Sequence, residues 1–357
     1  MSEDYRTNVR KSSRDNPFRM ARVVVVGGGV IGCAIAERLT LERHQVTLLE
    51  RDQLGCRASG AAAGELSPHS ESAGGTLESA VRSLDMFPEL VARIEKDSGM
   101  RVEYHLQEAL QPALDEREAA RLKATGGRWL DAQACHDAEP FLTPDVLGAV
   151  LRQEAHVTPP RFVRALARCA SARGAEIREG APATGFAVAG GEVQQVITSE
   201  GAIEADWFVI AAGPWSKEVA MGAGVNVEVR PQRGQLALLN PGSVSLTRTV
   251  FWSTGYFVPK PDGTIVAGST EEDSGFDDRP TVAGIATLMD FARRVVPGLG
   301  AATVERTWAG LRPVTPDGEP IVGAVAGIAN LIVATGHHRK GILLAPFAAA
   351  TVAAAIK

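Results

Sequence analysis

The order of apolar and polar positions near the amino end predicts a strand, a helix and a second strand. Four consecutive valines at residues 23–26 end at glycines, as expected for a strand buried on both faces of a parallel sheet. Residues 30–44 follow with apolar side chains at helical spacing, and residues 45–50 form a second apolar run. We therefore expect a βαβ unit across residues 22–50.

The same two patterns recur along the rest of the chain. Apolar residues at helical spacing predict a long helix over residues 75–99, which Pro88 is expected to kink. Thr158 and the prolines after it predict the start of another helix, which Gly174 is expected to end. The remaining predictions are helices over residues 281–299 and 337–357, and strands within residues 193–211, 229–275 and 331–335.

The βαβ features lie at the start, middle and end of the chain, with antiparallel-looking strands between them. This arrangement favours an α/β fold in which a Rossmann-like nucleotide domain is interleaved with a mostly antiparallel, α+β substrate-binding domain. The expected division gives residues 21–90, 152–228 and 306–357 to the first domain and residues 91–151 and 229–305 to the second. Residues 1–20 are polar and are expected to form a flexible tail.

Composition excludes several classes of protein. A chain of 357 residues suits two domains better than one, because single cores stop growing near about 250–300 residues. A net charge of −5 gives no electrostatic basis for binding nucleic acid or an anionic membrane, and no apolar run is long enough to span a bilayer. The four cysteines are scattered without a CxxC pair, which favours free thiols and a cytoplasmic location.

Three glycines follow the first predicted strand in the spacing GxGxxG. We expect Gly27 to make the tight turn, Gly29 to let the backbone approach a pyrophosphate, and Gly32 to let the helix pack close to the strand. Glu50 closes the second strand, where a carboxylate can accept both ribose hydroxyls and would repel a 2′-phosphate. The motif predicts a bound dinucleotide and leaves NAD and FAD open.

A second glycine turn leads into a helix near the carboxyl end. The strand at residues 331–335 runs through Gly336 into a helix that begins near Gly341, whose first turn offers free N–H groups and positive partial charge. One dinucleotide needs only one pyrophosphate site, so this helix end must serve another group. A flavin is a candidate, because reduced flavin carries negative charge over N1 and the C2 carbonyl.

Two arginines and a tyrosine are the candidate substrate contacts. Arg312 is interpreted as lying in a tight GLRP turn; its guanidinium suits a carboxylate, but a surface ion pair explains it equally well. Arg339 has the alternative of a polar helix start, and Tyr256 that of ordinary strand packing. The histidines lack metal-ligand spacing and no nucleophile motif occurs, so we predict no metal site.

With these motifs the chain resembles the glycine oxidase family, FAD-dependent oxidases associated with thiamin biosynthesis within the wider D-amino-acid oxidase and sarcosine oxidase group. The resemblance runs from Arg22 to the end of the chain. The segments that carry it are VVVVGGGVIG, SGAAAG, FVIAAGPWS, YFVP, GTIVAGST, WAGLRPVTPDGEPIVG and ATGHHRKGILLAP, and the last two are the most specific.

The resemblance implies a non-covalently bound FAD. The residues that it places against FAD are Gly27, Gly29, Val30, Ile31 and Gly32; Glu50 and Arg51; Ala58, Ser59, Ala63, Gly64 and Glu65; Ala183; and His337, His338, Arg339, Lys340, Gly341, Ile342 and Leu343. Residues 337–343 would wrap the isoalloxazine ring, and Ala183 would contact adenine through its backbone.

The resemblance also implies how a substrate would bind and react. Arg312 would grip its carboxylate, Tyr256 would add a hydrogen bond, and Arg339 would lie nearby. Hydride would pass from glycine or another small amine to flavin N5 without an acid or base side chain, so no catalytic residue is named. Oxygen would reoxidise the flavin, giving an oxo acid, ammonia or an amine, and hydrogen peroxide. We also expect a homo-oligomer.

Two residues depart from the pattern of that family. Glu65 follows AAAG where an apolar residue is expected beside the flavin, and Lys340 replaces a neutral polar residue. The carboxylate would repel an anionic substrate unless it points away or meets a cation such as Lys340. The substrate therefore stays open among glycine, sarcosine, small D-amino acids and larger amines. The alternative functions are an FAD-dependent D-amino-acid dehydrogenase with a non-oxygen acceptor and a non-catalytic flavin-binding subunit; an NAD dehydrogenase fits least.

Overall fold

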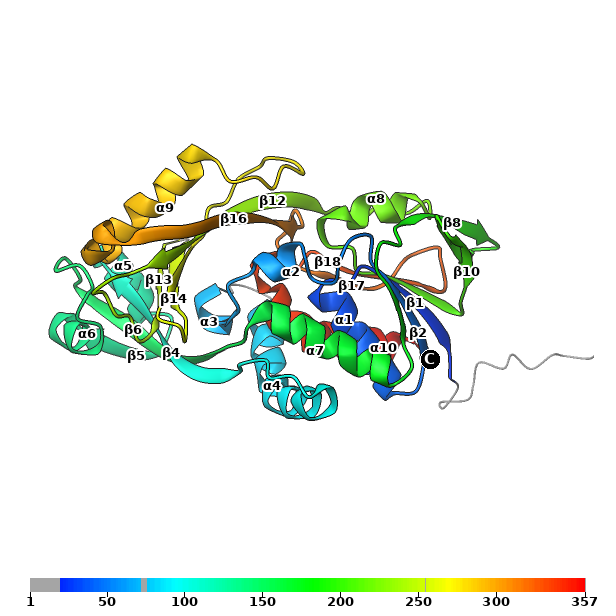
Figure 1. The fold of residues 1–357 in the computed structure, drawn as a ribbon, viewed down its shortest axis with the longest axis horizontal. Helices are drawn as coiled ribbons and strands as arrows, with labels where there is room; N and C mark the ends of the chain where they lie inside the picture. The colour runs from blue at the N-terminus through cyan, green and yellow to red at the C-terminus, as the bar shows by residue number, and fades with distance from the viewer. Residues whose placement is uncertain (1–19, 72–75, 254, 357) are drawn as a thin grey trace, which may run out of the picture.

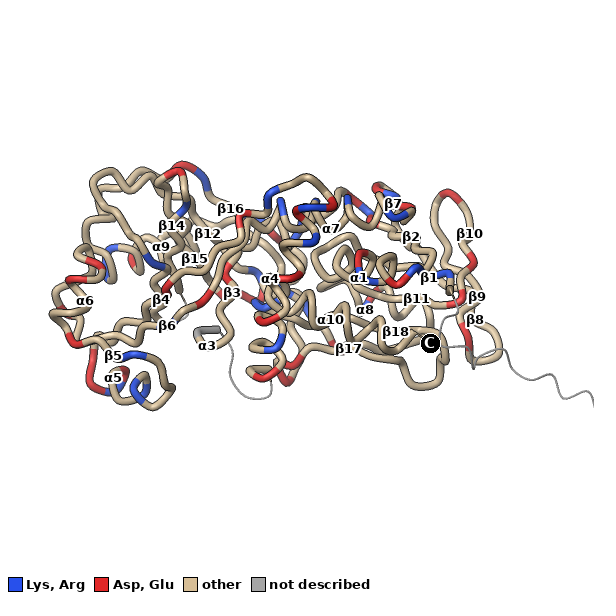
Figure 2. The backbone as a smooth tube through the Cα atoms, turned by 90° about the horizontal axis from the view of Figure 1, so that it is seen from below, with Lys and Arg blue, Asp and Glu red and all other residues tan. Residues whose placement is uncertain are grey.

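Two large β-sheets lie side by side along the molecule in this computed structural model (Figure 1), which describes residues 20–71, 76–253 and 255–356. The predicted tail, except for its last residue, lies outside the described residues. Figure 2 shows acidic and basic residues interspersed over both halves of the molecule, in keeping with the small net charge of −5.

The first large sheet has six strands in the order β17-β18-β11-β1-β2-β7, parallel except for β17. Its strands are β1 (Arg22–Val26), β2 (Gln45–Leu49), β7 (Glu176–Arg178), β11 (Trp207–Ile210), β17 (Ile321–Ala324) and β18 (Leu331–Thr335). With α1 (Val30–Leu41) between β1 and β2, the predicted βαβ unit and the α/β fold class are confirmed.

The valines of β1 explain why this sheet is covered on both faces. Side chains alternate between the faces of a strand, so Val23 and Val25 point to one side and Val24 and Val26 to the other. The first pair packs with α1 and with α4 (Thr76–Ser98), α7 (Pro159–Ala172) and α10 (Gly341–Ala355). The second pair packs with α8 (Ser216–Met221) and with a three-stranded sheet of β8 (Ala183–Ala189), β9 (Glu192–Thr198) and β10 (Gly201–Glu204).

The second large sheet has nine strands in the order β16-β12-β15-β14-β13-β4-β6-β3, with β5 beside β6. Its strands are β3 (Glu65–Leu66), β4 (His105–Ala113), β5 (Arg128–Asp131), β6 (Gly148–His156), β12 (Arg230–Asn240), β13 (Thr249–Trp252), β14 (Gly255–Pro259), β15 (Ile265–Gly268) and β16 (Thr303–Val314). One face packs on α6 (Ala132–Ala138) and α9 (Val282–Val295), and α5 (Glu116–Lys123) packs against β4 and β6. The opposite face carries Ala109, Phe251 and Tyr256 toward Ala63.

The remaining elements are short. They are α2 (Ala58–Ala61), α3 (Pro68–Glu71), η2 (Gly213–Trp215), η3 (Pro297–Ala301) and η4 (His338–Lys340). Within the described ranges, no helix combines the length and the apolar character that crossing a bilayer requires. The division of the chain into two interleaved domains stays a prediction, because sheets and packing alone do not fix its boundaries.

One local prediction differs from the structure, and a second is confirmed without the expected side-chain hydrogen bond. Arg312 does not lie in a tight turn: it belongs to β16, where it pairs with Gln232 of β12. Pro313 is tolerated in this strand because β16 is at the edge of its sheet, where a missing N–H costs little. Thr158 is the N-cap of α7 as predicted; its hydroxyl donates to Glu103 at 2.5 Å and accepts no hydrogen bond from a helix N–H.

Candidate cofactor and substrate site

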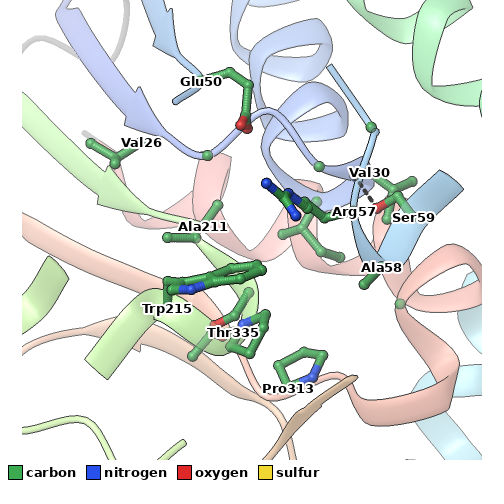
Figure 3. Close-up of a pocket in the computed structure, with 18 of the residues that line it drawn as sticks. Val26, Val30, Glu50, Arg57, Ala58, Ser59, Ala211, Trp215, Pro313 and Thr335 are labelled. Carbon is green, nitrogen blue, oxygen red and sulfur yellow. Dashed lines mark hydrogen bonds between the residues drawn. The ribbon is translucent and has the colours of Figure 1, made fainter. Parts of the chain in front are cut away.

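Two adjoining cavities lie at the carboxyl ends of the parallel strands β1, β11 and β18, where ligands of open α/β sheets bind. The larger has a volume of about 370 Å³ and the smaller about 80 Å³. The larger one, shown in Figure 3, follows the sheet edge, and the smaller one borders the nine-stranded sheet. The two share the lining residues Ala58, Ala62, His338, Arg339 and Ile342.

The glycine turn after β1 is built as the spacing predicts. Gly27 has a φ of +114°, and a Cβ there would lie 2.4 Å from the carbonyl oxygen of Ala211. A Cβ on Gly32 would lie 1.9 Å from the carbonyl oxygen of Gly27, so the third glycine lets α1 pack against the turn. A Cβ on Gly29 would meet only the Ser59 hydroxyl, at 3.3 Å. Gly29 therefore leaves room on the cavity side of the turn.

The amino end of α1 is a ready site for an anion. Its N-cap is Gly29, which has no side chain to cap the helix, and no acidic residue lies in its first turn. The N–H of Val30 donates to the Ser59 hydroxyl at 2.9 Å (Figure 3). Because Ser59 sits where the helix dipole is positive, its hydroxyl and the first N–H groups can together hold a pyrophosphate.

Glu50 lines the larger cavity at the end of β2, and its carboxylate is held by the backbone. It accepts hydrogen bonds from the N–H of Gly28 at 2.6 Å and from the N–H of Asp52 at 2.9 Å. Each carboxylate oxygen can accept more than one hydrogen bond, so these contacts orient Glu50 and still leave it able to accept a ribose hydroxyl.

Two arginines and a tryptophan form the wall next to Glu50. The Arg51 guanidinium lies 3.8 Å from the centre of the Trp215 ring and that of Arg57 lies 5.9 Å from it. Both arginines also donate to Asp52, at 3.0 and 2.9 Å. Figure 3 shows Arg57 and Trp215 on the same side of the cavity. This flat, cationic wall suits an adenosine ring and its phosphates.

The sequence reasoning named Arg51 and Ala183 in this region and missed Arg57, Trp215, Pro313 and Thr335, all of which line the larger cavity. A usable signal existed for two of them. Trp215 follows β11 and Thr335 ends β18, and the carboxyl ends of neighbouring parallel strands meet at the same sheet edge.

The far end of the larger cavity lies where β18 leads through η4 into α10. His337 lines the cavity and is buried, and burial lowers its pKa to about 4. Its buried Nε2 atom has no hydrogen-bond partner in the part of the chain that the structure describes. No acidic residue lies in the first turn of α10, so the positive end of its dipole faces this region. A polar, electron-accepting ring bound here could form a hydrogen bond with His337 and would lie at the positive end of the α10 dipole.

The smaller cavity brings the three predicted substrate contacts together: Arg312, Tyr256 and Arg339 all line it. The Arg339 guanidinium lies 5.7 Å from the centre of the Tyr256 ring and donates to Glu271 at 3.2 Å. Arg312 donates to the carbonyl oxygen of Thr270 at 3.0 Å and to the hydroxyl of Ser269. The guanidinium of Arg312 is therefore fixed in place before a substrate arrives.

Two glycines make space for these side chains. A Cβ on Gly234 would lie 2.3 Å from the Arg312 guanidinium, and a Cβ on Gly268 would lie 2.7 Å from the Tyr256 ring. Because both glycines belong to strands beside the cavity, larger residues there would displace the two substrate contacts.

Three predicted cofactor contacts line neither cavity: Gly32, Lys340 and Leu343. Lys340 is buried and donates to the hydroxyl of Thr76 at 2.5 Å. Leu343 is buried in the core, and its carbonyl oxygen accepts from Ser83 at 2.6 Å. Every other predicted contact lines one or both cavities. Within the described residues, no three His, Cys, Asp or Glu side chains are grouped to hold a metal ion.

Glu65 and Lys340, which the sequence left open as a possible ion pair, make hydrogen bonds to different elements. The Oε2 atom of Glu65 accepts from Gln107 at 2.9 Å and from Thr249 at 3.1 Å. The reason is topological: β3 places Glu65 over the nine-stranded sheet, whereas Lys340 points toward α4.

These features fit FAD. The anion site at α1 lies within the larger cavity. One end of this cavity has the arginine and tryptophan wall that suits adenosine, and the other end has the buried His337 and the start of α10. Gly29 leaves the turn open where a Cβ would project toward a phosphate. The smaller cavity adjoins the His337 end through shared residues, so a substrate there would touch the flavin ring.

Buried histidines make the stability of the protein depend on acid pH. Burial lowers the pKa of His337 to about 4 and that of His156 to about 3. An unfolded histidine has a pKa of about 6.5, so below that pH the unfolded state binds more protons than the folded state. The free energy of unfolding should therefore fall on acidification, by about 2 kcal/mol for each of these histidines at pH 5.

Denaturant unfolding at pH 7 and pH 5 measures this loss. In a His156→Gln variant the loss between the two pH values should shrink by about 2 kcal/mol. The matched control is His136→Gln, at a half-buried histidine of α6, which should leave the loss unchanged. Equal losses in the wild type and in His156→Gln would contradict the assignment.

Comparison with known proteins points to the same cofactor, FAD. A family model described as FAD dependent oxidoreductase (DAO) matches residues 22–355. Among curated proteins, a glycine oxidase of Bacillus licheniformis is 34% identical over 331 residues, covering 90% of this chain and 89% of that protein. A bifunctional protein ThiO/ThiG of Synechocystis sp. is 36% identical over 340 residues, covering 92% of this chain and 50% of that protein. The chain thus spans about half the length of the bifunctional relatives.

Solved structures of amine oxidases have a similar fold. A crystal structure of glycine oxidase from Geobacillus kaustophilus superposes with a TM-score of 0.88 at 30% identity, covering 94% of each chain. A crystal structure of iminodiacetate oxidase from Chelativorans sp. BNC1 superposes with a TM-score of 0.86 at 25% identity, covering 94% of this chain and 95% of that one.

Proposed function

The chain belongs to the family of FAD-dependent oxidoreductases, and from that premise we propose that it oxidises glycine or another small amine to an oxo acid and ammonia or an amine, with release of hydrogen peroxide. The observation that carries the proposal is the convergence of Arg312, Tyr256 and Arg339 on a cavity of about 80 Å³ beside the flavin end of the cofactor cavity. Glycine oxidases among the relatives support this substrate class.

In this proposal the protein binds FAD along the larger cavity. Ser59 and the amino end of α1 hold the pyrophosphate, and Glu50 accepts the ribose hydroxyls. Residues at the start of α10 contact the ring. The bound FAD supplies a hydride acceptor for the carbon next to the substrate amine. The protein contributes position and electrostatic support, and no side chain is required to act as an acid or base.

The substrate is held by its carboxylate. Arg312 can present two parallel N–H donors to it, and Tyr256 can add a hydroxyl donor. Because Ser269 and Thr270 already fix the Arg312 guanidinium, little side-chain entropy is lost when the carboxylate binds. The small cavity excludes bulky side chains, which favours glycine, sarcosine and small D-amino acids over larger amines.

Anaerobic reduction tests the proposal. The purified protein should be yellow, and glycine or sarcosine added without oxygen should bleach its flavin absorbance. Air should then restore the absorbance with release of hydrogen peroxide, and acid denaturation should free the flavin, because we propose that FAD is bound non-covalently. A flavoprotein that no small amine bleaches would contradict the proposal.

The same assay separates the alternatives. Bleaching followed by slow peroxide formation and fast dye reduction would indicate a dehydrogenase with another acceptor, and bound flavin without bleaching would indicate a non-catalytic subunit. We further propose a cytoplasmic location, because all four cysteines are free thiols, as a reducing compartment favours. A homo-oligomer is a separate proposal. The association with thiamin biosynthesis also stays a proposal.

A further inference from the structure

Glu65 is a carboxylate that the proposed reaction does not use. It is only 8% exposed, and it lines the small cavity together with Arg312, Arg339 and Tyr256. In a cavity of about 80 Å³, an occupant lies close to every wall. Charges act strongly at such short range when little water separates them, so Glu65 bears directly on which molecules fit.

Neighbouring side chains hold Glu65 in place. Its Oε2 atom accepts from Gln107 of β4 at 2.9 Å and from Thr249 of β13 at 3.1 Å. Gln107 also donates to the Thr249 hydroxyl at 2.8 Å, which leaves the proton of that hydroxyl for Glu65. An ionised carboxylate only accepts hydrogen bonds, so two donors suit it. The carboxylate is therefore positioned, and it is not a mobile surface group.

The partners of Glu65 lie on the face of the nine-stranded sheet that borders the cavity. Side chains two residues apart share a face, so Gln107 lies on the same face as Ala109, and Thr249 on the same face as Phe251. Ala109 and Phe251 pack in one cluster with Tyr256, which lines the cavity. Glu65 is thus held on the substrate side of this sheet.

A half-buried lysine lies close to this carboxylate. Lys260 donates to the carbonyl oxygen of Ala63 at 2.7 Å and contacts Nε2 of His156 at 2.9 Å. Burial lowers the pKa of Lys260, and the negative charge of Glu65 opposes that shift. Lys260 lines neither cavity. A molecule in the small cavity therefore meets the carboxylate and not the ammonium.

We propose that Glu65 determines the specificity of the small cavity: it accepts a hydrogen bond from the amino group of a substrate whose carboxylate binds Arg312, and it rejects amines that carry a second carboxylate. The inference rests on the proposed function, because Arg312 must hold the first carboxylate. The favoured class is small monocarboxylic amines such as glycine, and the rejected class is dicarboxylic amines such as iminodiacetate.

Turnover of the two amines by charge-neutral variants tests this inference. The variants are Glu65→Gln, Glu65→Met and the control Glu103→Gln, which removes a charge that also acts on Lys260 but lies outside both cavities. The wild type should prefer glycine. The ratio of kcat/KM for iminodiacetate to that for glycine should rise on the order of tenfold in both Glu65 variants, which corresponds to about 1.4 kcal/mol, and stay constant in Glu103→Gln. An unchanged ratio in both Glu65 variants, or an equal rise in the control, overturns the inference.

Binding of carboxylates that lack an amine provides a readout without turnover. The holoenzyme is titrated with glycolate and with malonate while its flavin absorbance is recorded. The wild type should bind glycolate more tightly than malonate, and Glu65→Gln should narrow the gap in Kd on the order of tenfold. If the protein oxidises no amine, the proposed function fails, yet the malonate gap still decides the role of Glu65. If the ratio of the Kd for malonate to the Kd for glycolate is the same in the wild type and in Glu65→Gln, the inference about Glu65 is overturned.

Discussion

Replacing Arg312 by alanine should lower kcat/KM for glycine by roughly 30- to 4,000-fold, equivalent to about 2–5 kcal/mol. Arg312 lines the small cavity, and its guanidinium is fixed by Thr270 and Ser269. Without it, a substrate carboxylate would enter a partly buried cavity unpaired, and desolvating that charge accounts for the cost. Steady-state peroxide formation across a range of glycine concentrations measures the loss, and the FAD content should stay close to that of the wild type.

Two further variants make this result specific. Arg312→Lys keeps the charge but loses the planar pair of donors, so its activity should fall between those of the wild type and the alanine variant. Arg306→Ala removes an exposed arginine from the same strand, outside both cavities, and should leave kcat/KM unchanged. If Arg312→Ala oxidises glycine as well as Arg306→Ala does, Arg312 does not hold the substrate.

Gly29→Val should yield a folded protein that has lost its flavin. The side chain of the valine would project from the turn toward Ser59, into the space proposed for the pyrophosphate. Losing two charge-assisted hydrogen bonds to the phosphates costs about 3 kcal/mol, or about 150-fold in the Kd for FAD. Titration of the apoprotein with FAD, followed by fluorescence, measures the change, and circular dichroism should resemble that of the wild type.

Two other glycines provide controls for Gly29→Val. Gly32→Val should fail to fold, because its Cβ would meet the Gly27 carbonyl oxygen at 1.9 Å inside packed backbone. Gly185→Val, on β8, places its Cβ 3.9 Å from the nearest atom and should bind FAD like the wild type. If Gly29→Val binds FAD as tightly as the wild type does, the pyrophosphate does not bind at this turn.

Local sequence patterns were sufficient to predict the parts of the fold that obey a single period. The four valines of β1 predicted a strand covered on both faces, and the glycine spacing predicted the turn. Most residues proposed as cofactor contacts line one of the two cavities, and those of the βαβ turn do so because the turn has a fixed position relative to the sheet edge.

The parts that failed depend on contacts between distant segments. Arg312 was assigned to a turn because proline usually breaks regular structure, and only the position of β16 at a sheet edge shows why Pro313 is allowed. Lys340 was placed beside the flavin, but α4 supplies its partner Thr76, 264 residues away in sequence. No local pattern predicts such a pairing. Arg57 was missed for the same reason, whereas the position of Trp215 after β11 offered a signal that was not used.

The long pairing of β16 with β12 restricts how this site can change. Arg312 reaches the cavity from a 12-residue strand held in register opposite Gln232. An insertion or deletion of one residue in β16 between Arg306, which lies beside the bulge, and Arg312 would turn the guanidinium to the opposite face of the sheet. The position of the Arg312 guanidinium along the strand can therefore shift only in steps of two residues, or about 7 Å. A shift of that size would move the guanidinium out of reach of a substrate carboxylate. Altered substrate range should thus arise by side-chain replacement around a fixed anchor.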